Sequence, residues 1–232
     1  MRCSPYVSLV TLLLCGIVVT SAAAASVEDG FTPLFNGRDL AGWEGKPGFW
    51  SVEDGAITGQ TTAKNPIGQA STYLIWRGGK PADFDLRVQF RLVTGNSGVQ
   101  FRSRELPDFD MFGYQADMCT EGLWYGMLYE TSERGKIALR GQQAVIDENG
   151  QKSVTSLGDS AELLTYVKQG DWNQYRIIAR GNEITLLING VVMSRTIDRQ
   201  RGRAAAEGLI GFQLHPGPPM KVQFKNIRIK NL

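Results

Sequence analysis

Two polar side chains capable of acid–base and hydrogen-bond chemistry lie two residues apart near the end of the chain. They are Gln213 and His215, and His215 is the only histidine in the 232 residues. In an extended strand, residues two apart point to the same side of the sheet, so Phe212 and Leu214 point to the other. A lone histidine usually has a structural role. Here the alternation predicts an imidazole on a polar sheet face, where it could transfer protons near neutral pH.

Two earlier segments repeat this spacing with Gln100 and Arg102, and with Gln115 and Asp117. If the three strands are neighbours, one sheet face carries a polar cluster, to which Glu130 adds a second carboxylate. Aromatic residues beside this cluster could stack on sugar rings. The predicted catalytic residues are Arg102, Asp117, Glu130 and His215, and the predicted substrate-binding residues are Gln100, Gln115, Gln213, Trp124 and Tyr129. The alternative is an ordinary solvated sheet face with the aromatic residues in the core.

Several kinds of active site are not supported by the sequence. It contains no nucleophile elbow, phosphate-binding loop or HExxH motif. It also lacks the ExDxxE-like segment that many sandwich glycosidases use, although Asp117 and Glu130 could still form a carboxylate pair. His215 with these two carboxylates could instead hold a divalent metal ion through nitrogen and oxygen ligands. Both alternatives stay open at this stage.

The patterning of the chain is that of β-structure. Residues 84–92 alternate apolar and polar side chains, which predicts a half-buried strand. Asn189 and Gly190 join two strand patterns and predict a tight hairpin turn. The alternation in 222–229 slips at Asn226, which indicates a bulge. The only helical pattern covers 161–167. We therefore predict an all-β fold, an antiparallel β-sandwich of jelly-roll type.

The first 25 residues are typical of a secretory signal peptide. A charged start precedes an apolar run over 9–19 and an alanine-rich end at 21–25. The prediction is an exported protein, periplasmic or extracellular, with one domain over 26–232 and no transmembrane segment after cleavage. That domain keeps only Cys119, which excludes an internal disulfide. The net charge of +2, without a basic stripe, argues against a nucleic-acid partner.

Several segments carry a family resemblance. They are LFNGRDLAGW at 34–43, VEDGAI at 52–57, residues 83–90, NSG at 96–98 with FR at 101–102, GYQAD at 113–117, WNQY at 172–175, NG at 189–190 and residues 208–232. From about Phe31 to the C-terminus, the chain resembles the 3-keto-disaccharide hydrolase family. The resemblance implies a concanavalin A-like jelly roll and a small carbohydrate substrate. For characterised relatives, it implies cleavage of glycosides oxidised to a ketone at carbon 3.

The residues of the polar cluster could supply the catalytic groups that this chemistry needs. A ketone at carbon 3 acidifies the hydrogen on carbon 2, and the glycosidic oxygen on carbon 1 then leaves by β-elimination, followed by hydration. Such a reaction needs a base, a group that stabilises the enolate, and an acid. We expect Asp117 or His215 as the base, Arg102 at the enolate, and Glu130 or His215 as the acid. The amides of Gln100, Gln115 and Gln213 would orient sugar hydroxyls.

Two functions of other classes fit the same residues. A non-catalytic carbohydrate-binding module would use the polar face and its aromatic side chains without turnover. An interaction domain of the cell envelope would use an exposed apolar loop at Phe109, Met111 and Phe112. Packing of that loop onto the sandwich is the favoured interpretation of these three residues.

Overall fold

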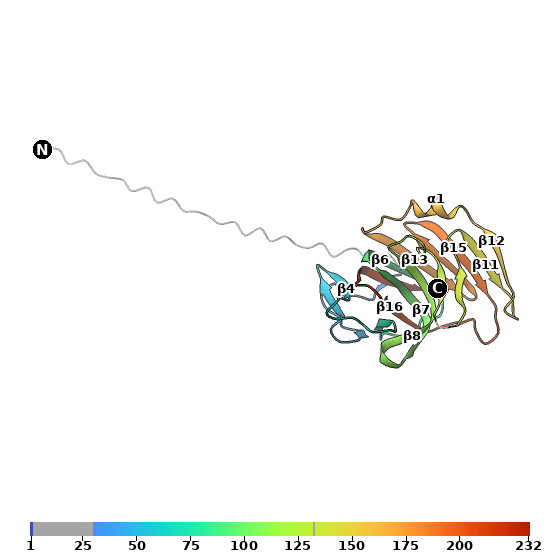
Figure 1. Ribbon diagram of the computed structural model, residues 1–232, viewed down its shortest axis with the longest axis horizontal. Helices are drawn as coiled ribbons and strands as arrows, with labels where there is room; N and C mark the ends of the chain where they lie inside the picture. The colour runs from blue at the N-terminus through green and yellow to red at the C-terminus, as the bar shows by residue number, and fades with distance from the viewer. Residues whose placement is uncertain (2–29, 132) are drawn as a thin grey trace.

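Two packed β-sheets form the body of the protein. The computed structural model describes Met1, residues 30–131 and residues 133–232. Apart from Met1, the predicted signal peptide therefore lies outside the described residues. Within the described part of the chain, no helix is long and apolar enough to span a membrane. The strands of the two layers run through most of the body in Figure 1.

The larger sheet has ten strands in the order β12-β11-β15-β14-β13-β6-β17-β4-β3, with β1 also paired to β17. Its neighbouring strands are antiparallel except for the β11–β15 pair, which is parallel. The strands are β1 (Thr32–Pro33), β3 (Trp50–Glu53), β4 (Ala56–Gln60), β6 (Phe84–Thr94), β11 (Gln142–Ile146), β12 (Lys152–Ser156), β13 (Asn173–Arg180), β14 (Glu183–Ile188), β15 (Val191–Asp198) and β17 (Lys221–Asn231).

The smaller sheet has seven strands in the order β10-β9-β8-β7-β16-β5-β2. The strands are β2 (Trp43–Gly45), β5 (Thr72–Trp76), β7 (Asn96–Leu106), β8 (Asp110–Cys119), β9 (Leu128–Glu130), β10 (Gly135–Ala138) and β16 (Leu209–Leu214). The three strands that carry the predicted polar pairs, β7, β8 and β16, are adjacent here. The predicted all-β jelly-roll sandwich is confirmed.

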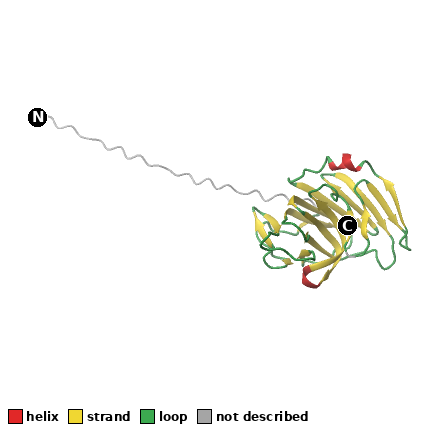
Figure 2. Ribbon diagram, in the orientation of Figure 1, coloured by secondary structure: helices red, strands yellow, loops and turns green. Residues whose placement is uncertain are grey.

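Among residues 30–131 and 133–232, helical structure forms two short segments, which lie at opposite margins of the view in Figure 2. The helix α1 covers Ser160–Leu164, so the predicted helix over 161–167 was too long. Asp159 caps it, because its Oδ1 atom accepts hydrogen bonds from the backbone N–H groups of Ala161 and Glu162, each at 2.8 Å. The 3₁₀ turn η1 covers Pro107–Phe109 between β7 and β8.

The predicted turn and bulge are confirmed. Asn189 and Gly190 both have positive φ angles, 51° and 84°, as the tight hairpin between β14 and β15 requires. In β17 the pairing with β6 shifts between Lys225 and Arg228, and Asn226 has a φ of 49°. The bulge returns Ile227 to the core after Val222 and Phe224, which removes the conflict in the alternation.

Aromatic stacking joins the two layers. The ring of Phe212, on β16, lies 4.9 Å from Trp43 on β2 and 3.9 Å from Phe224 on β17 of the other sheet, measured between centroids. All three side chains belong to the main core, and Phe212 has no exposed surface. Because β16 alternates, this inward placement of Phe212 turns its neighbour Gln213 to the outer face.

Replacing Phe212 with alanine tests this contact between the sheets. We expect Phe212→Ala to lower the free energy of unfolding by about 3–5 kcal/mol, since it removes a buried ring and leaves a cavity. Urea denaturation would measure the change. The control is Val154→Ala on the exposed strand β12, which should alter stability by less than about 0.5 kcal/mol. Equal effects of the two substitutions would contradict the assignment.

Candidate functional site

A cleft of about 430 Å³ lies on the outer face of the seven-stranded sheet. Its floor comes from β5, β8 and β16, and its rim comes from β9, β10 and the loops that follow β8 and β16. Six predicted site residues line it: Gln115, Asp117, Trp124, Tyr129, Gln213 and His215. The sequence analysis predicted no site role for the other lining residues, which are Ala70, Ser71, Tyr73, Asn96, Asp110, Met127, Thr131 and Lys136.

The floor holds a closed ring of three hydrogen bonds. The Tyr73 hydroxyl donates to Oε1 of Gln115 (3.3 Å), Nε2 of Gln115 donates to Oε1 of Gln213 (3.2 Å), and Nε2 of Gln213 donates to the Tyr73 oxygen (3.0 Å). Nε2 of Gln213 also donates to Ser71 (3.1 Å). All three members of the ring are buried. Each fixes the direction of the next, so the floor is a preorganised polar surface.

Asp117 lies beside this ring and is only 5% exposed. Burial raises the pKa of its carboxyl group to about 8, and this effect exceeds the lowering by hydrogen bonds from the Met118 N–H and the Gln115 amide. Among the described residues, Asp117 makes no ion pair that would offset its burial. A carboxylate of this kind is a much stronger base than a solvated one, so Asp117 is suited to accept a proton from carbon.

The space above the floor depends on Gly98. This residue pairs with Asp117 across the β7–β8 ladder. A Cβ atom added at Gly98 would lie 2.5 Å from two side-chain carbons of Gln115. The missing side chain therefore gives the Gln115 amide the room to lie next to Asp117.

The rim carries a histidine and a lysine. His215 is exposed, and its Nδ1 lies 2.7 Å from the carbonyl oxygen of Pro216. Because a carbonyl oxygen only accepts, Nδ1 must carry the hydrogen, which leaves Nε2 of the neutral ring to accept a proton. The Lys136 ammonium lies 4.1 Å from the ring centroid of Trp124, a cation–π contact. Tyr129, opposite Gln115 on the neighbouring strand, completes the rim.

Gln100 lies on the same sheet face but beneath the cleft surface. It pairs with Gln115 in the ladder and is fully buried. Its Nε2 atom donates to Thr131 (3.0 Å), while its Oε1 atom is buried without a partner in the described part of the chain. The structure thus groups Gln100 with the predicted substrate-binding amides without exposing it at the cleft.

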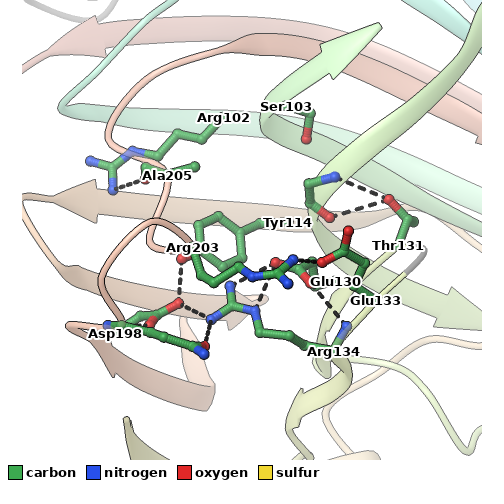
Figure 3. A network of polar contacts seen from close by, with 12 residues as sticks. Arg102, Ser103, Tyr114, Glu130, Thr131, Glu133, Arg134, Asp198, Arg203 and Ala205 are labelled. Atoms are coloured by element: carbon green, nitrogen blue, oxygen red, sulfur yellow. Dashed lines mark hydrogen bonds and ion pairs between the residues drawn. The ribbon is translucent and has the colours of Figure 1, made fainter. Parts of the chain in front are cut away.

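The expected grouping of Arg102 with this cluster is wrong, because β7 bulges at this residue. Its φ is 44°, and the pairing with β8 shifts between Phe101 and Arg104. The guanidinium donates to the carbonyl oxygens of Ala82, Gly181 and Ala205 and to Asp83. Figure 3 shows it directed at the loop of Ala205. The side chain thus ties loops together and lies away from the cleft.

Glu130 is also not with Asp117, because it faces the interior of the sandwich. Its oxygens accept from the backbone N–H and the guanidinium of Arg134, with the Nε contact at 2.8 Å. Arg134 bridges to Asp198 (2.7 Å), whose carboxylate also accepts from the Tyr114 hydroxyl (2.5 Å) (Figure 3). Tyr129 takes the outward position of β9 instead. The expected Asp117–Glu130 pair is therefore not formed.

The segment around η1 packs onto the sheet, as the favoured interpretation had it. Met111 is fully buried in a small cluster with Tyr73 and Ile75, and Phe109 packs against that cluster. The Arg104 guanidinium lies 4.5 Å from the ring centroid of Phe112. These contacts cover the apolar surface that an interaction domain would have exposed here.

Sequence reasoning missed Tyr73 and Lys136. Tyr73 belongs to a strand that is buried except at Trp76 and has no polar alternation. Only its pairing with Gln213 brings it to the cleft. Lys136 lies on a short strand whose position beside β9 follows from the tertiary fold. In the described residues, no group of three or more histidine, cysteine, aspartate or glutamate side chains could hold a metal ion.

The comparison with known families is decisive for the class of domain. Residues 30–230 match the model of the 3-keto-alpha-glucoside-1,2-lyase-like domain. The chain belongs to this family. The resemblance inferred from the sequence motifs is thereby confirmed. No curated protein matched the chain.

Solved structures of this lyase-like domain's fold include two proteins of Parabacteroides distasonis that carry the provisional name glycosyl hydrolase. One is 20% identical with a TM-score of 0.56, covering 87% of this chain and 99% of its own. The other is 21% identical with a TM-score of 0.55, covering 88% and 94%. The carbohydrate-binding module CBM66 of Bacillus subtilis is 12% identical with a TM-score of 0.54, covering 82% and 96%. At these identities the likeness shows the fold.

The raised pKa of Asp117 predicts that Asp117→Asn increases the thermal stability of the protein, and that this increase depends on pH. Between about pH 4 and pH 8 the wild-type protein holds this proton only when folded, so its stability falls as the pH rises. The neutral asparagine has no such dependence. We expect its melting temperature to rise relative to wild type by at least about 3 °C between pH 5 and pH 8, which corresponds to about 1 kcal/mol. A difference that is constant over this range would contradict the burial argument.

The interior position of Glu130 predicts a structural role for it. Glu130→Gln should lower the free energy of unfolding by about 3 kcal/mol, because Arg134 loses one of its two buried carboxylate partners. Chemical denaturation would measure this change. At temperatures where the variant is folded, binding or turnover at the cleft should equal that of wild type. Wild-type stability combined with lost activity would instead assign Glu130 to the functional site.

Proposed function

We propose that this protein cleaves the glycosidic bond of 3-keto-glycosides by β-elimination followed by hydration. The carbohydrate-active character of the fold follows from the family and its structural neighbours. The observation that carries the finer proposal is Asp117. This buried carboxyl group has no ion-pair partner in the part of the chain that the structure describes, and its pKa is raised to about 8. It lies in a cleft whose preorganised polar floor suits a sugar ring.

In this proposal Asp117 is the base that removes the hydrogen from carbon 2. The ketone at carbon 3 makes that hydrogen acidic, and a base of raised pKa matches a carbon acid better than an ordinary carboxylate does. Gln115 and Gln213 would orient ring hydroxyls through their remaining hydrogen-bonding capacity. Trp124 and Tyr129 would contact the C–H faces of the ring.

The strand order supports roles for the two rim residues. In the sheet, Lys136 on β10 lies to one side of the strand that carries Asp117, and His215, after β16, lies to the other. In the substrate, carbon 3 and carbon 1 flank carbon 2 in the same way. Lys136 would then stabilise the enolate oxygen on carbon 3, the role first assigned to Arg102. His215 would lie at the glycosidic oxygen on carbon 1.

The proton transfers balance over the two steps. The ionised form of Asp117 takes the proton of carbon 2, and the electrons of that bond form the carbon 1–carbon 2 double bond as the glycosidic bond breaks. The imidazolium of His215 protonates the departing oxygen. In the hydration, neutral Nε2 of His215 takes a proton from water as the water oxygen bonds to carbon 1. Asp117 then returns its proton to carbon 2, and both side chains regain their starting states.

We further propose that the protein is exported to the periplasm or the extracellular space. The support is the signal-like composition of residues 1–25. An exported enzyme of this kind would meet oxidised disaccharides outside the cytoplasm.

A non-catalytic carbohydrate-binding module is the second candidate. The fold likeness to CBM66 supports it, with a TM-score of 0.54. A binding module would use the same cleft, with Trp124 and Tyr129 as stacking surfaces. It would need no strong base, so the raised pKa of Asp117 favours the enzyme.

The deciding experiment is an assay with 3-keto-trehalose and its unoxidised parent, trehalose. We expect wild type to release the reducing sugar from the keto sugar only. We expect a loss of at least about a hundredfold in kcat for each of the variants Asp117→Asn, His215→Ala and Lys136→Met. Each variant should still show a cooperative thermal unfolding transition. Glu130→Gln is the control outside the cleft.

The possible outcomes separate the two candidates. Sugar binding without turnover by wild type would favour the binding module. Turnover by wild type that survives Asp117→Asn would refute Asp117 as the base.

A further inference from the structure

A second cavity of about 320 Å³ adjoins the cleft. The two share Asn96, Trp124 and His215, so together they form one elongated binding surface. The walls of the second cavity come from three connections: the start of β7, the loop after β8, and the residues between β16 and β17. Nothing in the proposed chemistry of Asp117 uses this space.

We propose that the second cavity is the subsite for the leaving sugar ring. This inference rests on the proposed function and adds which part of the substrate lies where. The 3-keto ring would occupy the cleft above Asp117, and the second ring of a disaccharide would occupy the cavity beyond His215. The preferred substrate is then a two-ring glycoside rather than a glycoside with a small aglycone.

The position of His215 supports this arrangement. It lines both cavities, and its Nδ1 is held by the Pro216 carbonyl oxygen at 2.7 Å. The oxygen that links two sugar rings must lie at the junction between their subsites. A residue that protonates this oxygen must stand at the same junction, and His215 does so.

The lining of the second cavity suits a polyhydroxylated ring. Trp124 and Pro218 offer apolar surface for C–H faces, while Thr120 and Glu121 offer oxygen atoms for hydroxyl groups. Asn96 adds an independent indication. Its Oδ1 atom is buried and has no hydrogen-bond partner among the described residues. A buried acceptor without a donor is costly, and a sugar hydroxyl at the junction would satisfy it.

A bulky residue at the far wall would test the subsite. Glu121 is exposed and lines the second cavity but not the cleft, so Glu121→Trp would fill the subsite and leave the reacting groups in place. Leu123→Trp is the matched control, since Leu123 is 56% exposed in the same loop and lines neither cavity. The substrates are 3-keto-trehalose, methyl 3-keto-α-glucoside and 4-nitrophenyl 3-keto-α-glucoside.

We expect Glu121→Trp to lower kcat/KM for 3-keto-trehalose by about tenfold or more and to leave the methyl glycoside unaffected. The control should match wild type on every substrate. An equal loss on the trehalose and methyl substrates, or no loss on either, would overturn the subsite while the proposed reaction stands. A loss on the nitrophenyl glycoside as large as on 3-keto-trehalose would overturn the assignment to a sugar. Failure of wild type to cleave any keto substrate would overturn the proposed function itself.

Discussion

The stacking of Phe212 between Trp43 and Phe224 is the contact on which the site depends. It joins the seven-stranded sheet to the ten-stranded sheet and fixes which side of β16 faces inward. Since a strand alternates strictly, a one-residue slip would bury Gln213 in the core and turn Phe212 toward water. The apolar packing between the layers therefore determines which residues form the cleft floor, although none of these aromatic rings lines the cleft.

The polar groups of the cleft floor differ in whether they have interaction partners. Tyr73, Gln115 and Gln213 satisfy one another in a closed ring, which makes the surface rigid at little cost in unpaired groups. Asp117 differs, because burial raises the pKa of its carboxyl group and no described cationic side chain forms an ion pair with it. A protein evolving for stability alone would gain by neutralising such a group. Its presence in a cleft is the physical reason to expect chemistry there.

The charged residues of the interior serve a different purpose. Arg134 joins Glu130 to Asp198, and Arg102 joins three loops through their carbonyl oxygens. Both clusters are buried and have partners, as buried charges must. Strong electrostatic interactions thus stabilise the end of the sandwich that lies away from the cleft. Within the cleft, Asp117 makes no ion pair with any described residue.

The sequence by itself determined the sandwich, the hairpin at Asn189 and the outward polar positions Gln115, Asp117 and Gln213. These features follow from alternation and turn chemistry, which act over a few residues.

Only the tertiary structure decided the rest of the site. The bulge at Arg102 reverses the direction of a side chain that simple alternation would group with Gln100. The pairing of β5 with β16 and of β10 with β9 brings Tyr73 and Lys136 to the cleft. Strand pairing joins residues that are far apart in the chain, so no local pattern encodes it. Alternation and turn chemistry therefore could not identify Tyr73 or Lys136 as cleft residues.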